Sequence, residues 1–188
     1  EYKKIDDISL TLTAYYPLGM DRTKQYPAAV FFYGGGWRSG NISQFERHAQ
    51  YLAHRGMVCF LADYRVSERH GTTPFEAVKD AKSAVRYLRQ NADLLGIDPD
   101  KIVAGGGSAG GHLAAATGTL PAGQLAESGE SLKTSAKPNA LLLFNPVFDN
   151  GPGGFGHDRV GEDYLLISPL HNIAVGAPPT LVFLGTED

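Results

Sequence analysis

The stretch that most constrains the fold is Lys101–Leu113, KIVAGGGSAGGHL, in which five glycines surround a single serine. Three apolar residues near its start are typical of a short strand, and the alanine-rich residues after it are typical of a helix. Between them, Gly106–Gly110 matches G-x-S-x-G, the nucleophile elbow, a sharp strand-to-helix turn that holds a serine in a strained conformation. Glycine suits both ends of this motif because strand and helix cross there with no room for a Cβ. Ser108 is therefore a candidate nucleophile, near the N-terminal N–H groups of the following helix.

The same glycines allow a second interpretation. Gly105, Gly107 and Gly110 also satisfy G-x-G-x-x-G, the dinucleotide-binding fingerprint. That fingerprint usually belongs to the first strand–helix–strand unit and is followed by an acidic residue at the end of the next strand. Here the next strand candidate, Ala140–Phe144, is followed by Asn145 and a proline. These departures favour the elbow, and a glycine turn with an incidental serine is the third alternative.

Length and composition indicate one globular domain over residues 1–188. Of the 188 residues, 43% are hydrophobic and 20% charged, and the net charge is −3. The sequence has no run of basic residues that would indicate a nucleic-acid partner, and it has no apolar stretch as long as a membrane span. A single cysteine, Cys59, rules out an internal disulfide. The compartment stays open, because a sequence that begins at Glu1 fits a cytoplasmic protein and also an exported one whose leader has been removed.

Apolar patterning predicts an α/β fold. Tyr2–Ile5 and Ser9–Tyr16 are expected to form an antiparallel edge hairpin, because apolar and polar residues alternate in the second segment. The later strands are continuously apolar, as strands covered on both faces are, and they alternate with segments of helical periodicity. These strands are expected at Ala28–Tyr33, Met57–Ala62, Ile102–Ala104, Ala140–Phe144 and Thr180–Leu184, and the helices at Ser43–Arg55 (with Ser43 as N-cap), Pro74–Leu95 and Gly111–Leu120. This order predicts a mostly parallel, doubly wound sheet that begins with an antiparallel hairpin.

Polar and glycine-rich residues follow the ends of several predicted strands. Gly34–Trp37, Ser108, Asp149 and Asp188 each come after such an end, and ligands of doubly wound sheets bind beyond the carboxyl ends of the strands. We therefore expect these residues along one rim of the molecule. Consecutive glycines expose backbone N–H groups that suit an oxyanion, and an elbow adds the N–H of the residue after the serine, here Ala109.

Four motifs together resemble the α/β-hydrolase superfamily. They are Tyr33-Gly34-Gly35-Gly36-Trp37, Asp63-Tyr64-Arg65, Asp98-Pro99 and Gly106–Leu113. Within that superfamily the chain is most similar to the esterases with a His-Gly-Gly-Gly motif, which are the hormone-sensitive-lipase-like and bacterial feruloyl-esterase-like carboxylesterases. The resemblance implies a lipase-like serine esterase with a Ser–His–Asp triad and no cofactor or metal, acting on a small-molecule ester through an acyl-enzyme. It implies Ser108 as the nucleophile, Gly35, Gly36 and Ala109 as the oxyanion hole, and Asp188 as the acid.

The chain departs from these esterases in two places. Tyr33 stands where they usually have a histidine, directly before the glycines. Their catalytic histidine comes a few tens of residues after the acid, whereas this chain ends at Asp188. We therefore expect a hydrolase domain that is incomplete at its C-terminus, truncated after the penultimate strand, and that has little esterase activity by itself.

The histidines that are present are weak substitutes for the missing base. His157 lies in the glycine-rich segment Asp149–Ile173, which is long enough to form a lid or pocket wall, and His171 precedes the last predicted strand. His112 is expected to be structural, because it points along its helix rather than back at the serine. His48 and His54, on an early helix, are expected at the surface or in packing positions, and His70 follows Arg69 in a polar loop. Asp149 is the alternative acid, since some members of the superfamily take the acid from the preceding strand.

Other functions remain as alternatives. A non-catalytic hydrolase-like module that binds a small ligand would account for the missing histidine, and a nucleotide-binding oxidoreductase would use the glycine fingerprint. A peptidase of the prolyl-oligopeptidase kind shares the elbow, but the triple glycine before Trp37 favours esters. Finally, a last strand with a bare edge would favour pairing with a second copy of the chain.

Overall fold

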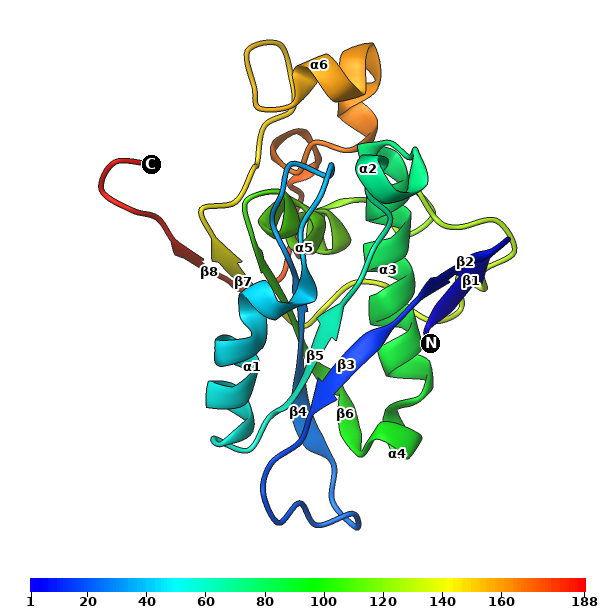
Figure 1. Cartoon of the computed structure of the whole chain (residues 1–188), viewed down its shortest axis with the longest axis vertical. Helices are drawn as coiled ribbons and strands as arrows, with labels where there is room; N and C mark the ends of the chain where they lie inside the picture. The colour runs from blue at the N-terminus through cyan, green and yellow to red at the C-terminus, as the bar shows by residue number, and fades with distance from the viewer.

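The computed structural model describes all residues, 1–188, and is built around a six-stranded sheet (Figure 1). In spatial order the strands are β3 (Leu12–Tyr15), β5 (Val58–Ala62), β4 (Tyr26–Phe32), β6 (Ile97–Gly107), β7 (Ala140–Phe144) and β8 (Thr180–Phe183). Every neighbouring pair is parallel except β3 with β5. The mostly parallel, doubly wound sheet predicted from the apolar runs is confirmed.

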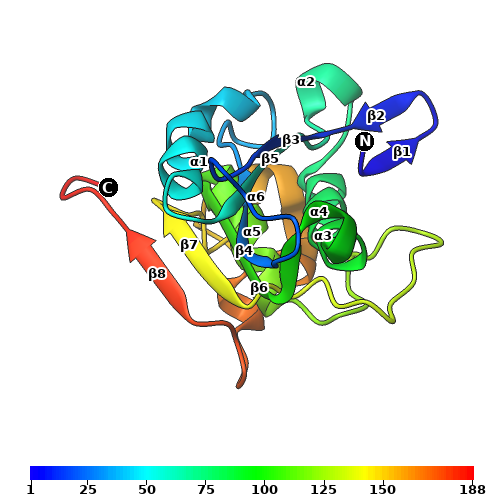
Figure 2. The same ribbon diagram turned by 90° about the horizontal axis from the view of Figure 1, so that it is seen from below.

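The N-terminal hairpin differs from the prediction. Residues 9–16 do not form one strand, because β2 (Ile8–Leu10) pairs with β1 (Lys3–Ile5) in a separate two-stranded sheet, whereas β3 joins the main sheet. The break falls at Thr11, whose carbonyl accepts a hydrogen bond from the Asp63 amide at 3.0 Å. Figure 2 shows the hairpin standing apart from the sheet. The alternating pattern concealed this break, since each half keeps a period of two.

Helices cover both faces of the sheet. On one face lies α1 (Glu46–Ala53), and on the other α3 (Pro74–Gln90) packs beside α5 (Ala109–Thr119) (Figure 2). The remaining helical elements are η1 (Ile42–Phe45), α2 (Ser67–His70), α4 (Ala92–Leu95), α6 (His157–Val160), η2 (Gly161–Leu166) and η3 (Leu170–Asn172). None of the helices combines the length and the apolar character needed to cross a bilayer.

All three predicted helices begin or end differently from expectation, and the third differs least, because α5 begins at Ala109 rather than at Gly111. The first starts as η1, and its cap is Asn41, whose side chain accepts a hydrogen bond from the Ser43 amide. The predicted N-cap at Ser43 was therefore wrong, because asparagine two residues earlier caps equally well. The second helix is interrupted at Asn91, whose amide side chain donates to the Tyr87 carbonyl at 2.8 Å and ends α3 before α4 begins.

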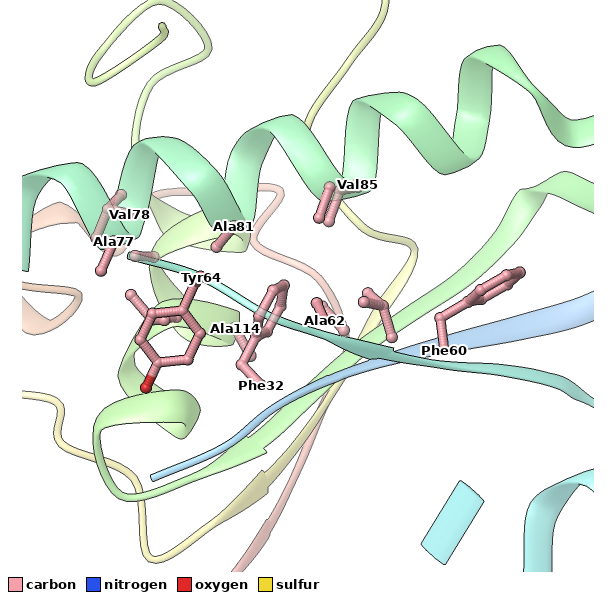
Figure 3. Close-up of a cluster of buried hydrophobic side chains, with 14 of the residues drawn as sticks. Phe32, Phe60, Ala62, Tyr64, Ala77, Val78, Ala81, Val85 and Ala114 are labelled. Carbon is pink, nitrogen blue, oxygen red and sulfur yellow. The ribbon is translucent and has the colours of Figure 1, made fainter. Parts of the chain in front are cut away.

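The core lies mainly between the sheet and α3 with α5. Figure 3 shows Phe32 and Phe60, from adjacent strands, facing Val78, Ala81 and Val85 of α3. These helix residues are fully buried, as their spacing along one stripe predicted. Alternate residues of the same strands pack on the opposite face in a smaller cluster around α1.

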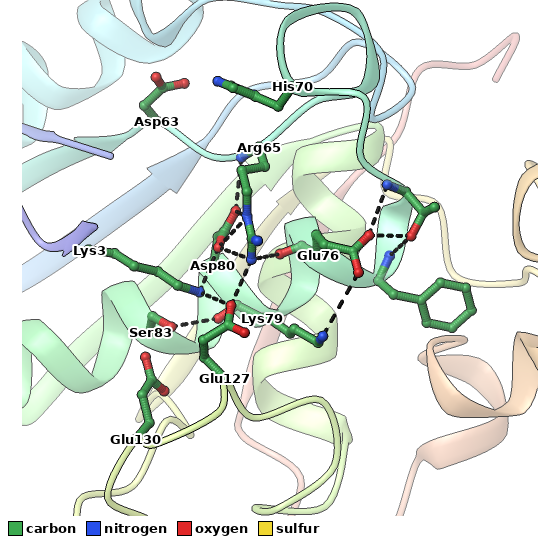
Figure 4. Close-up of polar contacts among 12 residues, drawn as sticks. Lys3, Asp63, Arg65, His70, Glu76, Lys79, Asp80, Ser83, Glu127 and Glu130 are labelled. Carbon is green, nitrogen blue, oxygen red and sulfur yellow. Dashed lines mark hydrogen bonds and ion pairs between the residues drawn. The ribbon is translucent and has the colours of Figure 1, made fainter. Parts of the chain in front are cut away.

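An ionic cluster of Lys3, Arg65, Asp80 and Glu127, called here the Asp80 cluster, joins four segments of the chain (Figure 4). The Asp80 carboxylate is fully buried and lies 2.6 Å from Lys3 Nζ and 2.8 Å from Arg65 Nη2. Glu127 lies 2.7 Å from each of the same two cations. Burial alone would raise the pKa of Glu127, but the hydrogen bond and charge of Lys3 and Arg65 lower it. The cluster thus ties the N-terminal hairpin and the irregular loop of residues 120–138 to α3.

The sheet ends on an uncovered strand. All four residues of β8 are exposed, and Leu181, Val182 and Phe183 expose 55%, 42% and 48% of their surface. Phe183 stacks on Phe144 and lines, with Phe31 and residues of α1, an open apolar groove of about 360 Å³. Figure 2 shows β8 and the C-terminal residues extending beyond the helices.

Candidate active site

Ser108 lies at the turn between β6 and α5, with φ 53° and ψ −121°. A positive φ is uncommon for a residue with a side chain and costs about 1–3 kcal/mol, so other contacts must hold it. The Ser108 amide donates to the Phe144 carbonyl on β7 at 3.0 Å. Its carbonyl accepts hydrogen bonds from the amides of His112 and Val147 at 2.9 and 3.2 Å. The strained, half-buried serine is thereby fixed in place by backbone bonds alone.

The glycines on either side of Ser108 are required by close contacts. A Cβ on Gly106 would lie 2.5 Å from the Phe32 carbonyl oxygen, and one on Gly110 would collide with the carbonyls of Phe32 and Tyr33. Strand β6 therefore turns into α5 directly against the end of β4. This is the close crossing that the G-x-S-x-G motif predicts.

The glycine loop, residues 33–37, lies directly beside Ser108. A Cβ built on Gly34 would be 3.2 Å from the Cβ of Ser108. Gly34 donates its amide to Gln44 Oε1 at 2.6 Å, whereas the amides of Gly35 and Gly36 make no hydrogen bond within the protein. The first residue of α5, Ala109, adds an N–H group that has no partner within the helix. The structure thus brings together the serine and the loop predicted to stabilise an oxyanion.

Tyr33 holds the start of the glycine loop. Its ring stacks on Tyr64 with centroids 4.2 Å apart, and Tyr64 Oη donates to the Tyr33 carbonyl at 2.7 Å. Tyr33 Oη donates to Asp63 Oδ1 at 2.8 Å and accepts from Arg69 Nη2 at 2.6 Å. Burial, together with the charge of Asp63, raises the pKa of the Tyr33 hydroxyl, which therefore stays protonated and donates. The Asp63-Tyr64-Arg65 motif was a sequence signal for part of this network, but nothing in the sequence indicated Arg69.

Two further contacts on this loop were missed from the sequence. Gln44 of η1 accepts a hydrogen bond from the Gly34 amide, and Arg159 of α6 donates from Nη1 to the Gly36 carbonyl at 2.7 Å. Arg159 is 123 residues from Gly36 in the chain, and no motif marks it. It comes from the segment 149–173 that was predicted to be a lid or wall, and Figure 1 shows α6 lying beyond the carboxyl end of the sheet.

None of the three histidines considered as a base is hydrogen-bonded to Ser108, and His157 and His171 both pack edge-on against the Tyr164 ring. His112 is fully buried, with Nε2 3.1 Å from the Ile167 carbonyl and its ring edge-on to Trp37. Its burial lowers its pKa to about 4, so it is neutral at physiological pH. His157 Nδ1 lies 3.0 Å from the Asn150 carbonyl, and His171 Nδ1 lies 2.9 Å from Ser168 Oγ.

The two candidate acids have different surroundings. Asp149 Oδ1 accepts a hydrogen bond from the Gly151 amide at 2.7 Å and lies 3.8 Å from His171 Nδ1. Asp188 is exposed at the end of the chain, and its carboxylate accepts only from the Gly185 amide, at 2.6 Å. Both follow the carboxyl ends of parallel strands, on the rim that also carries Ser108. His171 therefore lies near Asp149 without a hydrogen bond to it, and no histidine is hydrogen-bonded to Asp188.

We expect His112 to make stability depend on pH. In the unfolded chain it takes up a proton near pH 6.5, but in the native state only near pH 4, so the unfolded state gains protons first as the pH falls. The free energy of unfolding should therefore decrease between pH 6.5 and 4, by up to about 3 kcal/mol from this residue. Urea unfolding of the protein and of His112→Asn at pH 7 and 4.5 measures this, with the exposed His54→Asn as control. An equal loss of stability in all three would contradict it, as would NMR titration of His112 near pH 6.5.

Comparison with known proteins places the chain in one family and finds esterases among its relatives. The BD-FAE family model matches residues 13–149. Esterase LipC of Mycobacterium tuberculosis is 38% identical over 88% of this chain and 45% of its own length. Carboxylesterase NlhH of the same species is 33% identical over 50% of this chain and 29% of its own. The chain therefore spans less than half of the length of these curated relatives.

A solved structure matches the whole chain. The apo form of esterase 2 from Thermogutta terrifontis superposes with a TM-score of 0.94 at 46% identity, over 100% of this chain and 70% of that one. The predicted resemblance to esterases with an α/β-hydrolase fold is confirmed, and the overlap covers every element described above.

Proposed function

Because this chain belongs to the BD-FAE family, whose fold is that of the α/β-hydrolase esterases, we propose that it is a serine carboxylic-ester hydrolase acting on small acyl esters. The observation that carries the proposal is the close approach of the glycine loop to Ser108. A Cβ placed on Gly34 would lie only 3.2 Å from the Cβ of the serine. A nucleophile and free amide donors at one point are what acyl transfer requires.

In the proposed reaction, Ser108 Oγ attacks the ester carbonyl carbon while a base removes the hydroxyl proton. The carbonyl oxygen becomes an oxyanion, which accepts hydrogen bonds from the amides of Gly35, Gly36 and Ala109. The tetrahedral intermediate collapses, the base returns the proton to the leaving alcohol, and an acyl-enzyme remains. Water, deprotonated by the same base, then releases the acid and restores Ser108.

The base is proposed to come from a part of the domain that these 188 residues do not include. His112 is sealed in the core, and its ring nitrogen already faces a carbonyl. No hydrogen bond joins His157 or His171 to Ser108, and their Nδ1 atoms lie beside the Asn150 carbonyl and the Ser168 hydroxyl. We propose Asp188 as the acid that orients the missing histidine, with Asp149 as the alternative. Residues 1–188 would then be most, but not all, of a single hydrolase domain.

The relative with a solved structure supports a small acyl group and a nucleophile. Esterase 2 of T. terrifontis has been solved with propionate and with butyrate bound, and in a form phosphorylated by paraoxon. Short carboxylates are the acids that hydrolysis of short acyl esters releases, and phosphorylation requires a group on the enzyme that attacks phosphorus.

Hydrolysis of p-nitrophenyl acetate tests the proposal. A form of the protein extended past Asp188 by its natural continuation is expected to hydrolyse the ester. The 188-residue chain should accelerate the reaction by at most roughly 10³–10⁴-fold over water. Equal and robust activity of the two forms would show that a histidine within residues 1–188 is the base. No activity in a folded extended form would favour a non-catalytic binding module instead.

A further inference from the structure

The glycine loop has an unusual backbone, because three successive residues have a positive φ: 137° at Gly35, 61° at Gly36 and 59° at Trp37. Trp37 carries a side chain, so this conformation is costly for it and has to be held by contacts from outside the loop. One of them comes from α2, where the Ser67 amide donates to the Trp37 carbonyl at 3.1 Å. The others come from the segment 149–173, and Arg159 makes the hydrogen bond among them.

Arg159 acts on the loop at the Gly36 carbonyl. Its Nη1 donates to that oxygen at 2.7 Å, and no other hydrogen bond in the protein reaches it. The Arg38 amide donates to the Gly35 carbonyl at 3.0 Å, which closes a turn with Gly36 and Trp37 as its central residues. The turn lasts only while both central residues keep their positive φ, and glycine has no Cβ to limit its own rotation. The bond from Arg159 supplies that limit.

The same turn sets the direction of the Gly36 amide. This N–H group lies in one planar peptide with the Gly35 carbonyl and points the opposite way. While the Gly35 carbonyl faces the Arg38 amide, the Gly36 N–H therefore keeps one direction, and it makes no hydrogen bond within the protein. A free amide of fixed direction is what an oxyanion hole needs.

Arg159 is free to serve the loop and is held firmly. The nearest carboxylate, on Asp158, lies 3.8 Å from its Nε and is 78% exposed, which is too long for a hydrogen bond. The bond to the Gly36 carbonyl is thus the only one that the Arg159 side chain makes. Its neighbour in α6, Val160, is buried in the main core. A charged donor on an anchored helix makes a strong hydrogen bond to a carbonyl.

The indole of Trp37 joins the loop to the same segment. It is 2% exposed and meets the His112 ring edge-on, with centroids 5.0 Å apart. On the other side, a Cβ built on Gly156 would lie 2.7 Å from Trp37 Cζ3, and the Phe155 ring is 6.0 Å away. Residues 155–159 thus contact both the indole and the carbonyl before it, so a loop that loses Arg159 also loosens its tryptophan.

We propose that Arg159 is a positioning residue for the oxyanion hole. By holding the Gly36 carbonyl, it keeps the turn closed and the Gly36 amide directed at the oxyanion. This inference rests on the proposed function, because it takes that amide as a donor to the tetrahedral intermediate. Arg159 does not touch the ester. The segment 149–173 then helps to assemble the site and does not only enclose it.

The single tryptophan gives a test that needs no turnover. Trp37 is the only one in the 188-residue chain and is enclosed, so acrylamide quenches its fluorescence weakly while the loop is held. In Arg159→Gln, whose side chain is too short to reach the Gly36 carbonyl, we expect the quenching constant to rise at least about threefold, because the loop opens locally. Circular dichroism and urea unfolding should show the variant folded with a nearly unchanged midpoint.

Kinetics of the extended protein test the catalytic part. Arg159→Gln should lower kcat for p-nitrophenyl acetate by about 10–100-fold and leave KM nearly unchanged, since an oxyanion exists only after attack. Arg159→Lys keeps a charged donor for the single bond and should recover most of the loss. The matched control is Arg22→Gln, on an exposed arginine that stacks over Tyr16 as Arg159 does over Phe155. It should change neither the quenching nor kcat.

Unchanged quenching in Arg159→Gln would overturn the proposal, and so would an unchanged kcat. A rise in KM at constant kcat would make Arg159 a substrate-binding residue and would also overturn it. Failure of the esterase proposal gives a different result. If the extended protein does not hydrolyse the ester but Arg159→Gln exposes Trp37, the esterase is excluded and the hold of Arg159 on the loop remains.

Discussion

Replacing Ser108 by alanine is expected to lower the kcat/KM of the extended protein for p-nitrophenyl acetate by about 10⁴–10⁶. The substitution removes the atom that forms the acyl-enzyme, and the amides of Gly35, Gly36 and Ala109 can then only polarise the carbonyl for attack by water. The fold should stay intact, because Ser108 is held by backbone hydrogen bonds that alanine can also make.

The control is Ser9→Ala, on an exposed serine of β2, in the N-terminal hairpin that stands apart from the main sheet. It should retain full activity, and circular dichroism should show both variants folded. Activity retained in a folded Ser108→Ala protein would remove this residue from the mechanism. The oxyanion loop would then need another nucleophile.

Replacing the buried Asp80 by alanine is expected to lower the free energy of unfolding by about 3–5 kcal/mol, the cost of removing one partner from a buried ion pair. Asp80 is fully buried and accepts hydrogen bonds from Lys3 and from the Nε and Nη2 of Arg65. Without it, two cations remain in a buried site that has only Glu127 as a counter-charge. Because a typical domain is stable by only 5–15 kcal/mol, the variant should unfold at a much lower urea concentration at pH 7.

A matched variant removes a carboxylate from an exposed ion pair instead of a buried one, and so tests whether burial accounts for the loss of stability. Glu68→Ala removes a carboxylate from an exposed pair with Arg38, 3.4 Å apart, and should change stability by no more than about 1 kcal/mol. Similar urea midpoints for Asp80→Ala and Glu68→Ala would show that the Asp80 cluster contributes little. The hairpin would then be attached mainly by its apolar contacts.

Much of the fold could be predicted because burial leaves a periodic pattern in the sequence. The run Ala28–Tyr33 is apolar throughout since β4 is covered on both faces, and Val78, Ala81 and Val85 recur at helical spacing since α3 is covered on one. The break at Thr11 left no such pattern, because it depends on a hydrogen bond from Asp63, more than fifty residues away.

The candidate site divides in the same way. Ser108 and the glycine loop could be found because local strain demands glycine at fixed positions. The contacts of Gln44 and Arg159 with that loop could not, since they join elements that become neighbours only in the folded chain. The roles of Asp149, Asp188 and the histidines stay predictions, because a triad is defined by side-chain geometry at long sequence separation.

The bare edge at β8 has a consequence for solubility. Its outer side offers unpaired N–H and C=O groups, and the run Leu181–Leu184 exposes apolar side chains with no charge or proline among them. Such a segment is the kind that templates intermolecular strands and amyloid-like aggregation. Aggregation through β8, rather than unfolding, should therefore limit the concentration at which the 188-residue chain stays in solution. Val182→Lys should reduce this aggregation, because a charge on the exposed strand opposes pairing with another chain.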